Sequence, residues 1–257
     1  MTAEHGAVLR REDPPLLRGE GTFIGGLRVP ALDGALHAAF VRSIEPHARL
    51  VSVDVDDALA MPGVVAVLTG DDQRDELWPL PPRLPMMNQG MQRSMLAVDV
   101  VRFVGEAVAI VVAETAAQAA DAVEAVYVDY DPLPAVVDLD DALSDRVVLH
   151  ERAGTNVSWH WALPVPDVDP FASCDVVVEF DIRHTRLNPG PLEPRSGAAV
   201  WGSDGRLTTW VCSQRPAGAK HVIECSMGLE PGTVRAIAPD VGGGFGAKGG
   251  WGCYPED

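Results

Sequence analysis

Short stretches in which apolar and polar residues alternate recur through the first half of the chain, and turn-forming residues separate them. Residues 36–43 and 49–55 have the two-residue period of half-buried strands, and residues 64–69 have the composition of a further strand. The run AVAIVVA, residues 107–113, is apolar throughout, as in a strand that is buried on both faces. The pattern therefore predicts several strands, one of them covered on both sides.

Predicted helices alternate with these strands. Thr115 and Gln118 form a capping box, and apolar residues recur behind it at helical spacing as far as Val123. Residues 56–61 predict a shorter helix, because a proline and a glycine follow them directly. This alternation predicts a mixed α/β domain that occupies residues 15–150.

The pattern changes after residue 156, and a second domain is predicted over residues 156–257. A long strand is expected at 174–183, where three consecutive valines occur. The other expected elements are two strands around the turn SDGR, a helix that begins with a proline, and a strand that leads into a glycine-rich stretch. They occupy residues 197–202, 207–213, 216–228 and 233–238.

Charge and hydrophobic content narrow the possible functions. The 257 residues carry a formal charge of −17 at pH 7 and are 47% hydrophobic, which is typical of a globular protein and unfavourable for binding a phosphate backbone. No apolar run is long enough for a signal peptide or a membrane span, so we expect a cytoplasmic protein. The four cysteines lack the spacing of a zinc or iron–sulfur site. We expect no metal ligands and no nucleic-acid partner.

The stretch DVGGGFGAKGG, residues 240–250, concentrates glycines in one loop. Gly244, Gly246 and Gly249 match the dinucleotide motif G-x-G-x-x-G, but such a site needs a helix and an acidic residue about twenty positions later. A P-loop needs Gly-Lys-Ser/Thr, whereas Lys248 lies between alanine and glycine. A flexible linker stays open, although a central aromatic residue is atypical of one. The other interpretation is a loop whose main chain approaches a bulky anionic ligand.

Five segments, in collinear order, resemble the large, molybdenum-binding subunit of the xanthine dehydrogenase, aldehyde oxidase and carbon monoxide dehydrogenase family. In the second half these segments are LEPRSGAAVW, TTWVCSQRP and PDVGGGFGAKGG. In the first half, the segments that begin GTFIGGLRVP and VRFVGEAVAI resemble the α/β-hammerhead domain of that family. The resemblance implies an α+β (mixed α/β) fold, in which a hammerhead domain precedes the incomplete start of a molybdopterin-binding domain.

The resemblance also implies a partial site for a molybdenum–molybdopterin cofactor. By position, Gln214 matches the glutamine that hydrogen-bonds an oxygen ligand of molybdenum, and Gly243, Gly244, Phe245 and Gly246 match the loop whose main chain lies against the cofactor. A carboxamide donates a hydrogen bond without adding charge, and glycine amides donate at short range, so both assignments are chemically reasonable.

Other polar residues near these motifs have two interpretations each. Glu193 and Arg195 are candidates for contacting the substrate, and the alternative is a structural ion pair beside a strand. His184 is more simply a packing or hydrogen-bonding histidine, because no second histidine stands at ligand spacing. Ala247 stands where many relatives have glycine, and Gly249 stands where xanthine-oxidising relatives have glutamate, which weakens a purine assignment.

The resemblance also implies that residues needed for activity lie outside this chain. Family members continue for several hundred residues, which bring further cofactor loops and the glutamate that acts as general base. We therefore expect no catalytic residue in this chain and no activity from it alone. We expect partners that are an iron–sulfur small subunit and an FAD-binding medium subunit, and a small-molecule substrate that is an aldehyde, an N-heterocycle or carbon monoxide.

Two interpretations of the chain's extent are open. The segment YPED at residues 254–257 has the pattern of a helix opening, which favours a truncated product or half of a split subunit that a C-terminal complementary chain completes. The alternative is a non-catalytic assembly or interaction module. An interrupted domain predicts a large exposed apolar patch beyond about residue 156.

Overall fold

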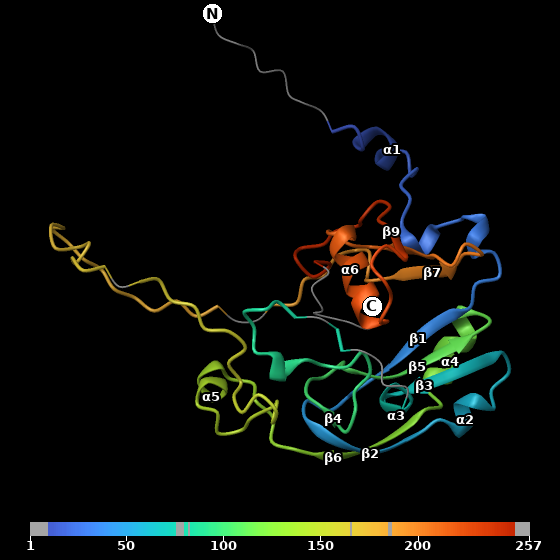
Figure 1. The fold of residues 1–257 in the computed structure, drawn as a ribbon, viewed down its shortest axis with the longest axis horizontal. Coiled ribbons are helices and arrows are strands. Elements are labelled where there is room, and N and C mark those ends of the chain that lie inside the picture. The colour runs from blue at the N-terminus through green and yellow to red at the C-terminus, as the bar shows by residue number, and fades with distance from the viewer. Residues whose placement is uncertain (1–9, 76–79, 82, 165, 185–186, 250–257) are drawn as a thin grey trace, which may run out of the picture.

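The computed structural model describes residues 10–75, 80–81, 83–164, 166–184 and 187–249. The helices in this part of the chain are α1 to α6 and the strands are β1 to β9 (Figure 1). The α-helices are α1 (Asp13–Leu17), α2 (Asp56–Leu59), α3 (Gly70–Asp75), α4 (Ala116–Val123), α5 (Leu139–Leu143) and α6 (Pro216–Ser226). Short 3-10 helices are η1 (Ile24–Gly26), η2 (Pro30–Leu32) and η3 (Gln89–Met91).

The first antiparallel sheet has the strand order β1-β5-β3, built from β1 (His37–Arg42), β5 (Ala107–Ala113) and β3 (Val64–Thr69). Strand β5 is central and largely buried, which confirms the prediction from its uninterrupted apolar composition. Helix α4 packs on this sheet and begins at Thr115, whose side chain accepts a hydrogen bond from the backbone N–H of Gln118. Val41, Val111 and Ala122 are among the buried residues of this core.

The second sheet has the order β4-β2-β6 and is also antiparallel. Its strands are β4 (Val100–Val101), β2 (Ala48–Asp54) and β6 (Tyr127–Pro132). Ala48 and Val101 from this sheet pack against Val108 of β5, so the two sheets share one apolar core. The predicted mixed α/β first domain is confirmed.

The third sheet has the order β7-β8-β9 and lies apart from the first two (Figure 1). Strands β7 (Gly197–Trp201) and β8 (Leu207–Val211) are antiparallel, whereas β8 and β9 (Val234–Ile237) are parallel and are joined through helix α6. A parallel pair needs such a crossover, so the strand, helix and strand predicted in this region form one βαβ unit.

The N-terminal segment belongs to this third sheet. Ile24 packs with Trp210 and Cys212, and the N–H of Thr22 donates to Asp240 while the N–H of Asp240 donates to the Thr22 carbonyl. Residues that follow the predicted start of the first domain at 15 therefore contribute to the core of the second. No local pattern in residues 20–32 indicates this long-range contact.

The predicted strand at 174–183 is wrong. From α5 to β7 the described residues form no helix or strand, and residues 166–184 are exposed throughout. We call residues 159–184, without residue 165, the arm; it projects away from the rest of the described chain, turns, and runs back toward it (Figure 1). Alternating apolar residues favour a strand, but a strand forms only where a second strand supplies backbone hydrogen bonds, and no described strand pairs with the arm. A side-chain contact does link the arm to α5, because Arg183 donates to Asp140 at 2.8 Å. The predicted helix opening at 254–257 lies outside the described residues.

The arm accounts for the apolar patch expected beyond residue 156. Its exposed large apolar side chains, which no described element covers, are Trp159, Trp161, Leu163, Val168, Phe171, Val176, Val177, Val178, Phe180 and Ile182. Soluble chains rarely expose so many large apolar side chains in succession, and such a surface marks an interaction site. Among the described helices, none is long and apolar enough to span a membrane.

Candidate functional site

The candidate site lies at one edge of the third sheet, where strands β8 and β9 end. Gln214 follows β8, and the glycine loop, residues 242–248, follows β9. Because β8 and β9 are parallel neighbours, their carboxyl ends meet at the same edge of the sheet. Two segments that are about thirty residues apart in sequence are thereby placed together.

Direct hydrogen bonds join the two segments. The side-chain Oε1 of Gln214 accepts from the backbone N–H of Gly246 at 3.1 Å. The backbone N–H of Gln214 donates to the carbonyl of Lys248 at 2.9 Å, and the Ser213 hydroxyl donates to the same carbonyl at 3.3 Å. The structure thus brings the predicted glutamine and the predicted loop into contact, whereas their role in holding a cofactor stays a prediction.

Glycine is required at particular positions of this loop. The φ angles of Gly243 and Gly246 are 99° and 87°, in the region that favours glycine. Gly244 is needed for close approach, because a Cβ there would lie 2.4 Å from Cδ of Gln214. Phe245 also has a positive φ, 48°, which is uncommon for an aromatic residue. Such a conformation in a non-glycine residue is typical of functional sites.

The main chain of the loop fits an oxygen-rich anionic group. Within the described part of the chain, the N–H groups of Gly243, Gly244 and Phe245 donate to no protein acceptor. The Gln214 side chain is exposed and uses its oxygen for Gly246, which leaves its NH2 group as a donor. Successive N–H groups in alternating conformations form a concave anion-binding surface, which suits the oxygen ligands of a molybdenum–pterin group.

Glu193 does not project freely toward a substrate. Its carboxylate accepts from the Lys248 ammonium group at 3.0 Å and from the backbone N–H of Gly242 at 2.8 Å. Burial alone would raise the pKa of Glu193, but these hydrogen bonds outweigh burial and hold the pKa below its usual range. The structure therefore favours the structural ion-pair interpretation of Glu193.

The partner of that ion pair is Lys248, which sequence reasoning considered only as a possible P-loop lysine. The two residues are 55 positions apart, and no spacing rule connects them. Arg195 is half-buried two residues before β7. His184 is exposed, and the described residues hold no cluster of His, Cys, Asp and Glu that could bind a metal ion.

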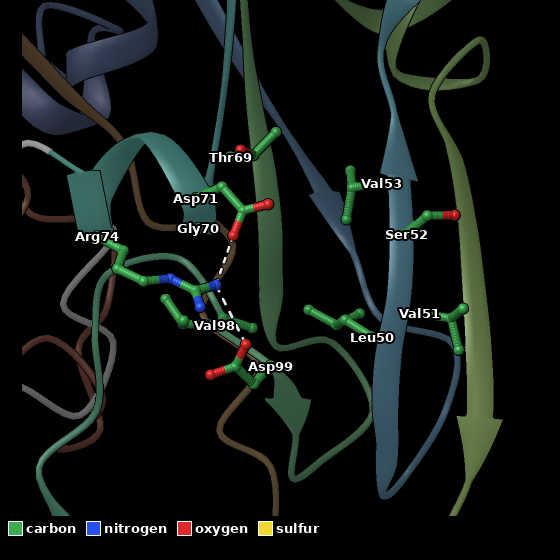
Figure 2. Close-up of a pocket in the computed structure, with 11 residues that line it drawn as sticks. Leu50, Val51, Ser52, Val53, Thr69, Gly70, Asp71, Arg74, Val98 and Asp99 are labelled. Atoms are coloured by element: carbon green, nitrogen blue, oxygen red, sulfur yellow. Dashed lines mark hydrogen bonds and ion pairs between the residues drawn. The ribbon is translucent and has the colours of Figure 1, made fainter.

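A separate cavity lies in the first domain and contains none of the predicted site residues. Its volume is about 200 Å3, and β2, the end of β3, helix α3 and residues 97–99 line it (Figure 2). Arg74, one of the lining residues, lies between Asp71 and Asp99 and pairs with both. These charged groups are exposed and neutralise one another in part, so the cavity offers no anion site comparable to the glycine loop.

Two family models match the chain in succession. Residues 26–134 match the aldehyde oxidase and xanthine dehydrogenase a/b hammerhead domain, and residues 149–256 match the molybdopterin cofactor-binding domain. The glycine loop and Gln214 therefore lie in the part of the chain that matches the cofactor-binding model.

Similar proteins include large subunits of known enzymes. The carbon monoxide dehydrogenase large chain of Hydrogenophaga pseudoflava is 36% identical, over 95% of this chain and 31% of that protein. The nicotine 6-hydroxylase large subunit of Paenarthrobacter nicotinovorans is 35% identical, over 94% of this chain and 30% of that protein. The crystal structure of quinoline 2-oxidoreductase from Pseudomonas putida 86 superposes with a TM-score of 0.82 and 35% identity, covering 94% of this chain and 31% of that one.

The chain spans about a third of the length of these relatives. The order of the two matched domains, the superposition and the resemblance in the glycine loop all agree. The chain belongs to the xanthine dehydrogenase, aldehyde oxidase and carbon monoxide dehydrogenase family, and it corresponds to the N-terminal portion of the large, molybdopterin-binding subunit.

Proposed function

We propose that this chain forms part of a molybdenum hydroxylase large subunit and that its glycine loop, with Gln214, holds one side of a molybdenum–molybdopterin cofactor. The observation that carries the proposal is the contact between Gln214 and Gly246 beside three backbone N–H groups that donate to no described protein acceptor. The second family model, which matches residues 149–256, supports the same assignment.

Each residue of the site has a distinct task in this proposal. The NH2 group of Gln214 donates to an oxygen ligand of the bound group, while its Oε1 is held by Gly246 and fixes the orientation of the carboxamide. The N–H groups of Gly243, Gly244 and Phe245 donate to other oxygens of the same group. When bound, the cofactor supplies the oxidation, in which a substrate carbon gains an oxygen derived from water and two electrons leave.

The substrate class is an aldehyde, an N-heterocycle or a similarly small molecule. Relatives are named for carbon monoxide, nicotine, quinoline and aldehydes, and the residues that choose among such substrates lie mostly outside this chain. We propose that electrons pass to iron–sulfur and FAD-binding partner subunits, and that the general-base glutamate lies in the remaining two thirds of the large subunit.

The arm is the surface on which that remainder packs. Its apolar side chains Val176, Val177 and Val178 are more than half exposed, and no described element covers them. The part of the relatives that this chain does not match is about twice as long as the part that it matches. A polypeptide with a free strand edge would supply hydrogen bonds to the backbone of the arm and would cover its apolar side chains. The same observation favours a second candidate function, a non-catalytic assembly module that binds a complementary chain and no cofactor.

One coexpression experiment separates these functions. The full chain is produced alone and together with a polypeptide that corresponds to the remaining two thirds of a relative's large subunit. We expect a complex that contains molybdenum and pterin, and we expect the chain alone to show no aldehyde- or heterocycle-dependent dye reduction. A complex that forms without molybdenum or pterin would favour the assembly module, and robust activity of the chain alone would refute the need for the remainder.

The arm is tested in the same experiment with a matched pair of variants. Val177→Asp places a charge in the arm and should abolish complex formation, because the charge would have to be buried in an apolar interface. Leu139→Asp, at an exposed position on α5 outside the arm, should leave the complex intact. Equal complex formation by both variants would exclude the arm as the docking surface.

A further inference from the structure

Lys248 carries the most deeply buried charge near the glycine loop. Its side chain is 0% exposed, and the side chain of its partner Glu193 is 10% exposed. The Lys248 ammonium group donates to the Glu193 carboxylate at 3.0 Å and to the Glu193 carbonyl at 2.8 Å. A buried ammonium group that lost this partner would be left uncompensated, so the two side chains hold each other in place.

The Glu193 carboxylate also reaches the start of the loop and the N-terminal segment. It accepts from the N–H of Gly242 at 2.8 Å and from the N–H of Ile24 at 3.4 Å. In return, the Glu193 N–H donates to the Gly242 carbonyl at 3.3 Å. The approach is close enough that a Cβ on Gly242 would lie 2.5 Å from Cβ of Glu193. The Glu193 carboxylate therefore contacts both ends of the loop, Gly242 at its start and Lys248 at its end.

Lys248 connects this arrangement to the predicted cofactor contact. Its carbonyl accepts from the backbone N–H of Gln214 and from the hydroxyl of Ser213. The side chain of Lys248 thus contacts Glu193, while its carbonyl holds the main chain of Gln214. From that position the Gln214 carboxamide reaches Gly246. A displacement of Lys248 would move the carboxamide and the loop relative to each other.

We propose that the buried Glu193–Lys248 pair is a positioning device that sets the glycine loop against Gln214, and that neither residue contacts substrate. This inference rests on the proposed function and replaces the substrate-side role considered for Glu193. Its physical basis is that the loop contains residues with left-handed backbone conformations, which persist only where the surrounding structure holds them.

The test measures amide hydrogen exchange on the full chain with selectively labelled glycine and glutamine. Glu193→Gln keeps the size and the acceptor oxygen but leaves the Lys248 charge buried and uncompensated, whereas Lys248→Met removes that charge. We expect each single variant to accelerate exchange at Gly246 by at least about tenfold and to shift the side-chain resonances of Gln214. We expect the double variant to recover part of both effects, because it buries no unpaired charge.

The readouts distinguish positioning from general stability. Amides of the β8–β9 ladder should exchange at the wild-type rate in the variants, and the matched control Glu20→Gln, which breaks an exposed ion pair with Arg18, should leave Gly246 unaffected. Exchange that rises equally in the ladder and in the loop, or exchange at Gly246 that is unchanged in Glu193→Gln, would overturn the proposal.

The outcome is separable from that of the proposed function. Exchange and the Gln214 resonances are measured on the chain without a cofactor, so they test the positioning role even where the chain binds no pterin. Pterin content of the coexpressed complex tests the proposed function by itself. Normal pterin content together with unchanged exchange would therefore reject only the positioning role.

Discussion

Replacing Gly244 with alanine tests the candidate site most directly. The added Cβ would lie 2.4 Å from Cδ and 2.6 Å from both Cγ and Oε1 of Gln214. Carbon atoms in contact prefer about 3.5–4.0 Å, so the overlap exceeds what small shifts can absorb. Gln214 is exposed and its side chain has several rotatable bonds, so we expect it to swing away and to lose its hydrogen bond to Gly246.

The effect on stability should be small and the effect on the site large. A lost hydrogen bond of this kind destabilises by about 0.5–1.5 kcal/mol, and replacing glycine with alanine offsets about 0.4–1 kcal/mol through the unfolded chain. The net change is within about 1 kcal/mol, which corresponds to a Tm shift of at most about 4 °C for a chain of this size. Loss of a hydrogen bond to a charged ligand group is larger, about 1.5–3 kcal/mol, so cofactor retention should fall by at least about tenfold.

The assay combines thermal unfolding of the full chain, hydrogen exchange at Gly246, and pterin content of the coexpressed complex. Gly25→Ala is the matched control, because no atom lies within 4 Å of the Cβ that it adds and its φ is not positive. We expect the control to match wild type in all three measurements. Wild-type exchange at Gly246 together with wild-type pterin content in Gly244→Ala would refute the close approach between Gly244 and Gln214 as a determinant of the site.

Further predictions concern the first domain and the residues that follow it. Burial, and nearby cations with Arg102 foremost, lower the pKa of His150 from 6.5 to about 4. Below about pH 6.5 the unfolded chain binds a proton at His150 that the folded chain resists down to about pH 4, so the free energy of unfolding should fall as pH drops from 6.5 to 4. Solvent screens a partly exposed group, so the loss should be about 1–2 kcal/mol; urea titrations should show that His150→Gln removes this loss and that His221→Gln, on α6, does not. Thr115→Ala removes the N-cap of α4 and should destabilise the chain by about 1 kcal/mol, and an unchanged urea midpoint would contradict this role.

Local sequence pattern predicted most elements well, for identifiable reasons. The run 107–113 is strand β5 to the residue, because a strand buried on both faces needs apolar residues at every position. Helix α4 begins where Thr115 predicted it, because the capping hydrogen bond involves neighbours in sequence. The two-residue strand β4 and the short helix α1 lacked a periodic signal and were missed.

The wrong prediction of a strand at 174–183 arose because local pattern does not determine whether a pairing partner is present. Alternation of apolar residues indicates a preference for extended structure, but the ladder that defines a strand depends on a partner elsewhere, and the described residues of the arm form no such ladder. The Glu193–Lys248 pair shows the same limit at the site, since charge and spacing suggested Arg195 as the neighbour of Glu193 while folding selected a lysine 55 positions away.

By itself, the sequence determined most elements of both domains, the family, and the identity of Gln214 and the glycine loop as candidates, because these depend on local pattern and on motifs that stand together in the chain. Tertiary structure alone decided that the ends of β8 and β9 bring Gln214 against Gly246, that residues near Ile24 cover the third sheet, and that Glu193 is a partner of Lys248. The physical reason is that parallel pairing, burial of charge and close backbone approach are relations between distant residues, and no short stretch of sequence contains both members of such a pair.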